Sequence, residues 1–281
     1  MTRQLAAPII VSDLFPEMRT ELLTILSGLS GQQWALPTAC DGWSVKDVVL
    51  HIVGDDLGIV SRKRDRFFIR DEFDSWDDLV TFINQSNNLW VDAARRMSVA
   101  VLCELLRFTG EMVNGCFASL DVLQSGGPVS WAGEGPAPIW LDVAREYTEY
   151  WMHHQHICDA LGINSLKDHR HFHPVLDAFI RALPHTYREV EAAPGTVITL
   201  RLTGMVDDCW HLLREEAGWV LCGEVDDAPD GVPTCTVTLP DDVAWRLFTK
   251  GITTEQARSQ AIISGDVALA EPVLQMVSIL A

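Results

Sequence analysis

Apolar residues recur every three or four positions through the first two thirds of the chain, which predicts long amphipathic helices. Ser44 and Asp47 have the form of a capping box, so a helix is expected to begin there and to run towards residue 60. Further helices are expected over 75–96, 98–123 and 138–161, with a loop rich in Gly and Pro over 124–137. The clearest single pattern covers residues 12–30, with apolar positions at Leu14, Met18, Leu22, Leu26 and Leu29.

The pattern changes near residue 192. A His-rich turn at 167–174 and one more helix at about 173–191 precede Ala193-Pro194-Gly195, which interrupts the helical periodicity. Segments 197–204, 209–223 and 234–240 then alternate or run apolar, as short antiparallel strands do. Two short helices, a strand at 261–266 and a closing helix at 269–280 are expected to follow. The predicted fold is mainly α, with a helical bundle over residues 1–191 and a small α+β domain over 192–281.

Composition narrows the class of protein. Of the 281 residues, 48% are hydrophobic and 21% charged, the balance of a globular protein, and no apolar run predicts a membrane span or a signal peptide. The formal charge of −18 disfavours nucleic-acid and membrane partners, because such a surface repels phosphate backbones and anionic lipids. The seven cysteines are scattered without a C-x-x-C pair, which argues against a disulfide framework and a cysteine zinc ribbon. We therefore expect a cytoplasmic protein.

The helix at 138–161 carries a polar stripe that leaves two interpretations open. Its members follow one another at helical spacing, which is typical of a solvated face. Only one basic residue, Arg145, flanks the stripe, however, and large aromatics surround much of the helix, as in a buried helix. Buried carboxylates and imidazoles need a partner, and a metal ion is a common one. The stripe consists of Asp142, Glu146, Glu149, His153 and His156.

His51 lies in an apolar run in the middle of the capped helix. By itself this position is more typical of a satisfied core histidine than of a ligand. It becomes a candidate because the helix at 138–161 offers Glu149 and His153, four residues apart on one face, and a metal site needs a third ligand.

Two other features are candidate functional sites. His169, His171 and His173 alternate in a short turn that could bind metal, although the segment lacks a carboxylate beside it and precedes Pro174. Cys40 precedes the capped helix and could be a reactive thiol, but the nearby Asp41 and Asp47 would raise its pKa, so we expect a structural role. The sequence contains no phosphate-binding glycine motif and no serine-hydrolase motif.

Two segments carry a family resemblance. Trp34, followed by the stretch from Pro37 to His51 (PTACDGWSVKDVVLH), looks like the opening signature of the DinB-like superfamily, closest to the mycothiol-dependent maleylpyruvate isomerase branch. The stretch from Glu149 to Gly162 (EYWMHHQHICDALG) resembles the second signature of that branch, a Glu-x3-His on the last bundle helix. Residues 236–251 and 261–277 are similar to the small α+β domain of these proteins. The resemblance implies a four-helix bundle that holds one divalent metal ion through His51, Glu149 and His153.

The chain departs from that family in two places. His156 stands where relatives often carry Asp, so the surroundings of the metal, or its ligand set, differ. Relatives that isomerise maleylpyruvate use an Arg from the C-terminal domain, and here Lys250-Gly251 stands where Gly-Arg is common, with Arg246 one helical turn earlier. His156 and Arg246 are accordingly the candidate catalytic residues, with Lys250 as an alternative cation.

The expected chemistry follows from three protein ligands that leave coordination positions open. A thiol bound there loses its proton near neutral pH and can add to an electrophilic carbon. Two imidazoles and a carboxylate suit Zn²⁺, and Fe²⁺ or Ni²⁺ tolerate the same set. The resemblance implies mycothiol as the thiol cosubstrate and an actinobacterial host. We expect a thiol S-transferase or thiol-exchange enzyme acting on a small electrophilic metabolite, as a monomer or homodimer. The alternatives are a maleylpyruvate-type cis–trans isomerase and a metal- or small-molecule-binding protein without catalysis.

Overall fold

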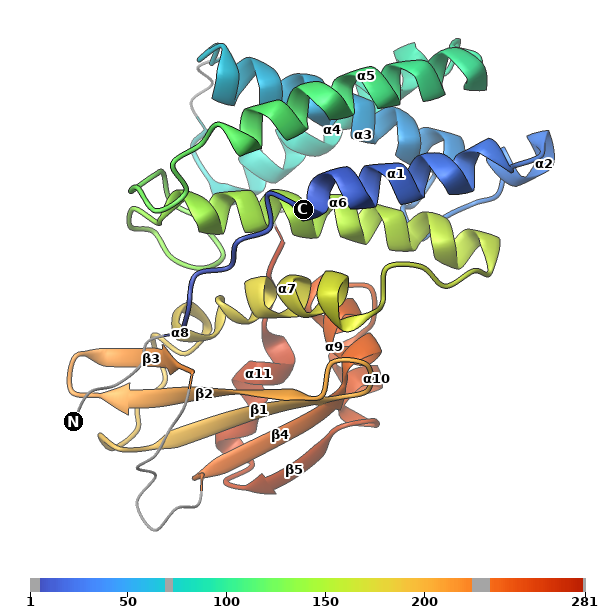
Figure 1. Cartoon of the computed structure of the whole chain (residues 1–281). Helices are drawn as coiled ribbons and strands as arrows, with labels where there is room; N and C mark the ends of the chain where they lie inside the picture. Colours follow the sequence, from blue (N-terminus) through green and yellow to red (C-terminus); the bar gives the residue numbers. More distant parts are fainter. Residues whose placement is uncertain (1–5, 69–72, 224–232, 280–281) are drawn as a thin grey trace. The chain divides into compact units, whose positions relative to one another are not determined.

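The computed structural model describes residues 6–68, 73–223 and 233–279 (Figure 1). The described residues form two compact units. We call residues 10–122 and 146–166 the bundle unit, and residues 6–9, 123–145 and 167–279 the sheet unit. The predicted fold class, a helical bundle followed by a small α+β domain, is confirmed. The predicted boundary between residues 191 and 192 stays a prediction, and residues 167–191 group with the sheet.

Long helices build the bundle unit, and serine side chains begin most of them. The side chains of Ser30, Ser44, Ser75 and Ser98 each accept a hydrogen bond from the backbone N–H three residues later, which satisfies a donor that the first turn leaves unpaired. Helix α3 packs against α4 and α5, and α1 packs against α5. The helices are α1 (Leu14–Ser27), the single turn α2 (Gly31–Trp34), α3 (Val45–Ile59) with its π-helical extension η1 (Val60–Arg64), α4 (Trp76–Ala94), α5 (Val99–Ala118) and the part of α6 (Ile139–Leu161) that begins at residue 146.

A buried carboxylate joins four of these helices. Asp56 of α3 is fully buried and accepts two hydrogen bonds from Arg19 of α1, at 2.7 and 3.0 Å. The hydroxyls of Thr109 on α5 and Tyr150 on α6 donate to the same carboxylate. Around it, the ring of Phe15 contacts aromatic rings of α5 and α6. Helices α1, α5 and α6 are therefore each bonded to α3 through Asp56 as well as by apolar packing.

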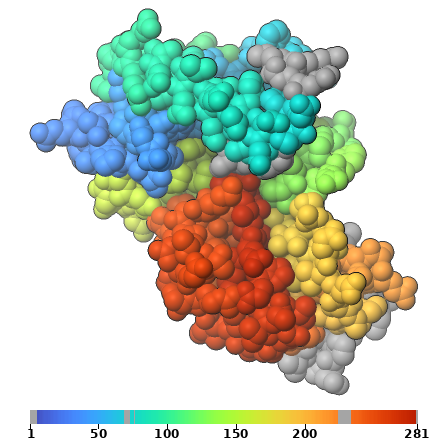
Figure 2. Space-filling model, turned by 180° about the vertical axis from the view of Figure 1, so that it is seen from behind, coloured from blue at the N-terminus to red at the C-terminus, as the bar shows by residue number. Residues whose placement is uncertain are grey.

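The sheet unit is built on five strands in the order β3-β2-β1-β4-β5. Three of the four strand pairs are antiparallel, as predicted, but β1 pairs with β4 in parallel. Alternating hydrophobicity identifies strands without specifying their direction, which is why the pattern misses this pair. Helices α9 to α11 lie together on this unit (Figure 2, orange-red to red). The elements are α7 (His169–Ile180), α8 (Leu183–Thr186), β1 (Val197–Thr203), β2 (Asp208–Glu215), β3 (Gly218–Cys222), β4 (Cys235–Pro240), α9 (Asp241–Phe248), α10 (Thr254–Arg258), β5 (Ile262–Gly265), η3 (Ala268–Ala270) and α11 (Glu271–Gln275).

Several segments differ from the prediction, and the helix expected at about 173–191 is divided into α7 and α8. The His-rich segment is the beginning of α7, because the side chain of Asp168 accepts a hydrogen bond from the His171 backbone N–H and caps the helix ahead of Pro174. The predicted closing helix is shorter than expected: α11 ends at Gln275, and Met276 takes an extended backbone conformation. None of the described helices is long and apolar enough to cross a bilayer.

Candidate metal centre

Helix α3 carries His51 to a nearly enclosed position. The capping box is present as predicted: the Ser44 hydroxyl accepts from the Asp47 N–H, and the Asp47 carboxylate accepts from the Ser44 N–H. Arg95 donates two hydrogen bonds to the same carboxylate and forms an ion pair with Asp47 at the start of α3. His51 lies within the helix after this fixed start, 4% exposed, with the ring of Trp43 5.0 Å away between centroids.

Helix α6 supplies the other two predicted ligands. Glu149 and His153 are one turn apart, and the Glu149 carboxylate lies 3.0 Å from the His153 Nε2. His153 is 6% exposed, whereas the Glu149 side chain is 35% exposed. The site therefore has a buried imidazole side and a carboxylate side that solvent reaches.

The structure brings the three predicted ligands together from the two helices. The Glu149 oxygen lies 3.8 Å from the His51 Nε2, the two imidazole centroids are 4.6 Å apart, and the three candidate ligand atoms all lie within 4.8 Å of one another. Four-coordinate Zn²⁺, with bonds of about 2.0–2.2 Å to N and O, separates its ligand atoms by about 3.3–3.6 Å. The donor set and its spacing fit a divalent metal ion, and metal binding itself stays a prediction.

The charges of the cluster favour a cation at its centre. Burial raises the pKa of Glu149, but hydrogen bonds and positive charge from His153 and His51 outweigh burial and hold that pKa well below its usual range. Burial lowers the pKa of His153, but the hydrogen bonds and negative charge of Cys40 and Glu149 prevail and raise it to about 10. Burial also lowers the pKa of His51, but Asp55 and Glu149 outweigh burial and raise that pKa. A divalent ion bound here would take the place of protons on these imidazoles.

Asp55 is a further carboxylate at this site. Its Oδ2 lies 3.0 Å from the His51 Nε2, and its side chain is 30% exposed. Asp55 follows His51 by four residues on α3, the same spacing that relates Glu149 and His153 on α6. This repeated i, i+4 pairing is the sequence signal from which Asp55 could have been inferred.

Cys40 also lies at the site, and its structural role stays a prediction, although the expected direction of its pKa is wrong. Its sulfur lies 3.1 Å from the His156 Nδ1 and 3.9 Å from the His153 Nδ1. Burial raises the pKa of the thiol, but hydrogen bonds and positive charge from the two histidines outweigh burial and lower it to about 6. The direction is opposite to the one expected from Asp41 and Asp47, because the histidines, distant in sequence, contact the sulfur. His156, predicted as a catalytic candidate, is thereby placed beside both Cys40 and His153.

Arg246, the other catalytic candidate, lies on α9 in the sheet unit. Its Nε is 3.1 Å from Asp242 Oδ2, and its guanidinium carbon lies 4.3 Å from the centre of the Trp245 ring. Burial raises the pKa of Asp242, but hydrogen bonds from Lys167, Trp245 and Arg246 lower it to about 2. Arg246 thus has an anionic partner within its own helix, and its catalytic role stays a prediction. The alternative cation, Lys250, follows α9 with a φ of 60°.

The competing His-rich segment forms no candidate metal group among the described residues. His171 Nδ1 lies 2.8 Å from Asp168 Oδ2 at the helix cap. The rings of His169 and His173 stack, and His173 Nε2 lies 2.9 Å from Asp208 Oδ2.

Fold and site together define a helical-bundle protein with a candidate metal centre between two of its helices. Residues 15–158, just over half of the chain, match the family model described as the mycothiol maleylpyruvate isomerase N-terminal domain, and the chain belongs to this family. The resemblance inferred from the two sequence signatures is confirmed.

Solved structures give further likenesses. A crystal structure of a mutant of the mycothiol-dependent maleylpyruvate isomerase is 11% identical, with 91% of this chain and 92% of that chain covered and a TM-score of 0.49. Another crystal structure of the mycothiol-dependent maleylpyruvate isomerase is 10% identical, with 84% and 86% covered and a TM-score of 0.44. A UbiJ-SCP2 ubiquinone synthesis protein is 24% identical over 37% of this chain and 90% of its own, with a TM-score of 0.25. No curated protein matches the chain.

Proposed function

We propose that this chain is a metal-dependent enzyme that uses mycothiol for thiol transfer or exchange on a small electrophilic metabolite. The observation that carries the proposal is the convergence of His51, Glu149 and His153, three donors of a kind and spacing that suit one divalent ion. Three protein ligands leave further positions for a non-protein ligand, as in catalytic rather than structural sites. The family to which the chain belongs is named for mycothiol, which supports that thiol as the cosubstrate.

When bound, a divalent ion would stabilise the thiolate form of a coordinated thiol and so supply a nucleophile at neutral pH. Two imidazoles and one carboxylate favour Zn²⁺, and Fe²⁺ and Ni²⁺ accept the same donors. A cytoplasmic location belongs to the same proposal, because the thiol must stay reduced.

The residues of the chain divide the remaining tasks. His51 and His153 are 4% and 6% exposed and exclude water from the buried side of the site. Glu149 and Asp55, whose side chains are 35% and 30% exposed, occupy the side from which a cosubstrate can enter. Asp55 Oδ2 lies 3.0 Å from the same His51 Nε2 that faces Glu149, so Asp55 can add an oxygen donor to the ion, and Trp43 packs beside the His51 ring. The contact with Trp43 restricts the orientation of the His51 ring.

The description of the family favours one second candidate function, cis–trans isomerisation of a maleylpyruvate-type substrate. Both reactions begin when the thiolate sulfur forms a bond to an electrophilic carbon. In isomerisation the same sulfur leaves after bond rotation and the thiol is regenerated. In transfer a different group leaves with the electron pair and the sulfur stays on the product. The two candidates therefore differ in the fate of mycothiol.

Metal analysis of purified protein tests the site. We expect at least one divalent ion per chain, loss of the ion held by His51, Glu149 and His153 in His51→Ala, and unchanged content in His169→Ala, a matched control outside the cluster. Full occupancy in His51→Ala would refute the assignment.

A thiol panel tests the cosubstrate. Saturating mycothiol should raise the melting temperature of metal-loaded protein more than that of metal-free protein, and more than glutathione or ergothioneine does. Equal shifts with and without metal would contradict binding through the sulfur. With an electrophile added, accumulation of an S-conjugate indicates transfer, whereas an isomerised product with mycothiol recovered indicates isomerisation. Binding without turnover of any electrophile would favour a binding protein.

A further inference from the structure

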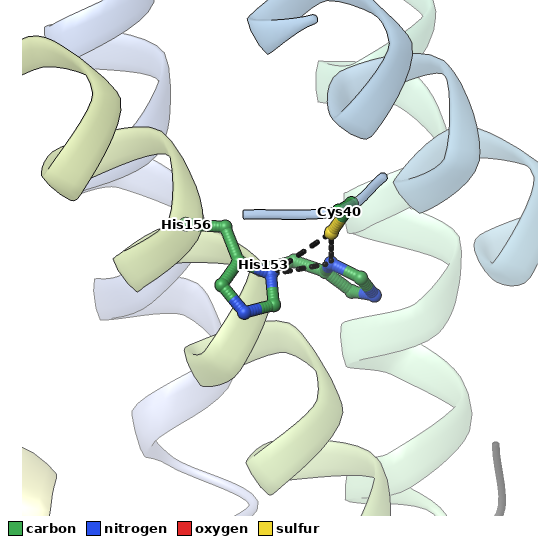
Figure 3. A group of neighbouring side chains, drawn as sticks. All are labelled: Cys40, His153 and His156. Atoms are coloured by element: carbon green, nitrogen blue, oxygen red, sulfur yellow. Dashed lines mark hydrogen bonds between the residues drawn. The ribbon is translucent and has the colours of Figure 1, made fainter. Parts of the chain in front are cut away.

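His153 presents its two ring nitrogens to two different groups of side chains. Its Nε2 lies 3.0 Å from Glu149, within the cluster described above. Its Nδ1 points the other way, 3.4 Å from the Nδ1 of His156 and 3.9 Å from the sulfur of Cys40 (Figure 3). Because a neutral imidazole has one free lone pair, His153 can bind an ion at either nitrogen, and binding ions at both requires the imidazolate form.

The atoms on the Nδ1 side form a second triangle of metal donors. The Cys40 sulfur lies 3.1 Å from the His156 Nδ1, which completes a set with distances of 3.1, 3.4 and 3.9 Å. A tetrahedral ion with bonds of about 2.3 Å to S and about 2.0 Å to N separates such donors by about 3.3–3.5 Å. One thiolate and two imidazoles are ligands that Zn²⁺ prefers.

We propose that Cys40, His153 and His156 form a second cation site, which takes Zn²⁺ or a divalent ion of similar preference. It shares the His153 ring with the first candidate site but no ligand atom. This proposal does not depend on the first site being catalytic, because its three donors are complete on their own.

The segment that carries Cys40 is held in place before any ion binds. The Cys40 N–H donates to the Thr38 hydroxyl, and that hydroxyl donates to the Trp43 carbonyl. The backbone N–H of Trp43 donates a hydrogen bond to the Cys40 carbonyl. Between them, Gly42 takes a φ of 73°, a left-handed conformation that suits glycine. Cys40 and His156 are only partly buried, so an ion can reach the site.

The local charges can support two ions. With both sites filled, the Cys40 sulfur would bind as a thiolate, and the His153 ring, which would then bridge the two ions, must give up both of its N–H protons to solvent. Cys40 thiolate, His153 imidazolate, Glu149 and Asp55 then each carry one negative charge. Together they balance two divalent cations, which removes the repulsion that would otherwise oppose double occupancy.

Titration of the metal-free, full-length protein with Co²⁺ tests the second site without any assay of activity. A cobalt–thiolate bond gives a charge-transfer band in the near ultraviolet, which imidazole and carboxylate ligands do not give. We expect wild-type protein to bind two Co²⁺ ions and to show the band. His51→Ala, or Glu149→Gln should His51→Ala fail to fold, should keep one ion and the band. Cys40→Ser and His156→Ala should keep one ion and lose the band, while His153→Ala should lose both ions.

Cys103→Ser is the matched thiol control, because Cys103 is a partly buried free cysteine outside the cluster. It should behave as wild type, and circular dichroism should show that each variant is folded. Absence of the band in wild-type protein, or its persistence in Cys40→Ser, would overturn the second site. A single ion whose band disappears in both Cys40→Ser and His51→Ala would also overturn it, since that result describes one mixed site. Wild-type stoichiometry in His51→Ala would refute the first site and leave the second standing.

Discussion

Helices α6 and α7 each carry three histidines close together in sequence: His153, His154 and His156 on α6, and His169, His171 and His173 on α7. On α6, two of the three meet donors from other elements, namely His51 of α3 and Cys40 of the preceding loop. On α7, each histidine has a local structural partner: a cap carboxylate, a stacked ring or a neighbouring strand.

The difference shows that density of histidine does not make a site. A metal ion needs donor atoms that converge on one point, and convergence requires elements distant in sequence. The α7 histidines use their nitrogens to pair with Asp168 and Asp208 and their rings to stack on Trp210, which stabilises the sheet unit. The variants below separate these two uses of histidine.

The largest effect is expected for His153→Ala, because His153 contributes a nitrogen to both candidate sites. Its metal content, measured by mass spectrometry after gel filtration, should fall to near zero. His173→Ala should keep the metal content of the wild type. Loss of metal from His173→Ala at unchanged fold would break the distinction between the two helices.

Asp56→Ala should produce the largest loss of stability. Its removal leaves the Arg19 guanidinium buried without its anionic partner, which costs about 3–5 kcal/mol of the free energy of unfolding. Asp92→Ala is the control: its side chain is 66% exposed and pairs with Arg95, so urea denaturation should show a loss of about 1 kcal/mol or less. Similar losses in the two variants would contradict the role given to Asp56.

Asp55→Asn should weaken metal binding at the first site by about 10–100-fold without unfolding the chain, since it removes a negative charge and an oxygen donor 3.0 Å from the His51 Nε2. Competition with a chelator measures the affinity. Asp142→Asn serves as the control. Asp142 lies on α6 in the polar stripe that also contains Glu149 and His153, but its carboxylate pairs with Arg145. If both variants bound metal as wild type does, Asp55 would be only a surface partner of His51.

The smallest effect is expected for Asp168→Ala, which removes the cap of α7 and should cost about 1 kcal/mol at neutral pH. Burial raises the pKa of Asp168, but the hydrogen bond and charge of His171 outweigh it and lower that pKa. The carboxylate therefore contributes its stability above the ordinary carboxyl pKa, near pH 4, and loses it as the pH falls through the lowered value. Unfolding of wild type and variant should converge in acid, and a constant difference would exclude the ionised cap.

Local sequence signals predicted much of this molecule. The capping box of Ser44 and Asp47 located the start of α3, and the four-residue spacing placed Glu149 and His153 on one face of α6. These signals work because they depend on the geometry of a single helix.

What the sequence did not predict depends on contacts between distant segments. Nothing near Cys40 in sequence indicates that His153 and His156 approach its sulfur, so the local acidic residues gave the wrong direction for its pKa. The helical start of the His-rich segment was missed because Pro174 suggested an interruption, whereas the Asp168 cap sets the beginning ahead of it.

Asp56 has a consequence for how the chain tolerates change. Because Tyr150 and Asp56 are bonded directly, α3 and α6 cannot slide along each other by even the 1.5 Å rise of one residue without losing that bond. Glu149 is the immediate neighbour of Tyr150, and His51 lies five positions before Asp56, so the same bond keeps the donors of the two helices in register. Insertions in the connections between these helices can therefore accumulate during evolution while the donor atoms keep their mutual distances.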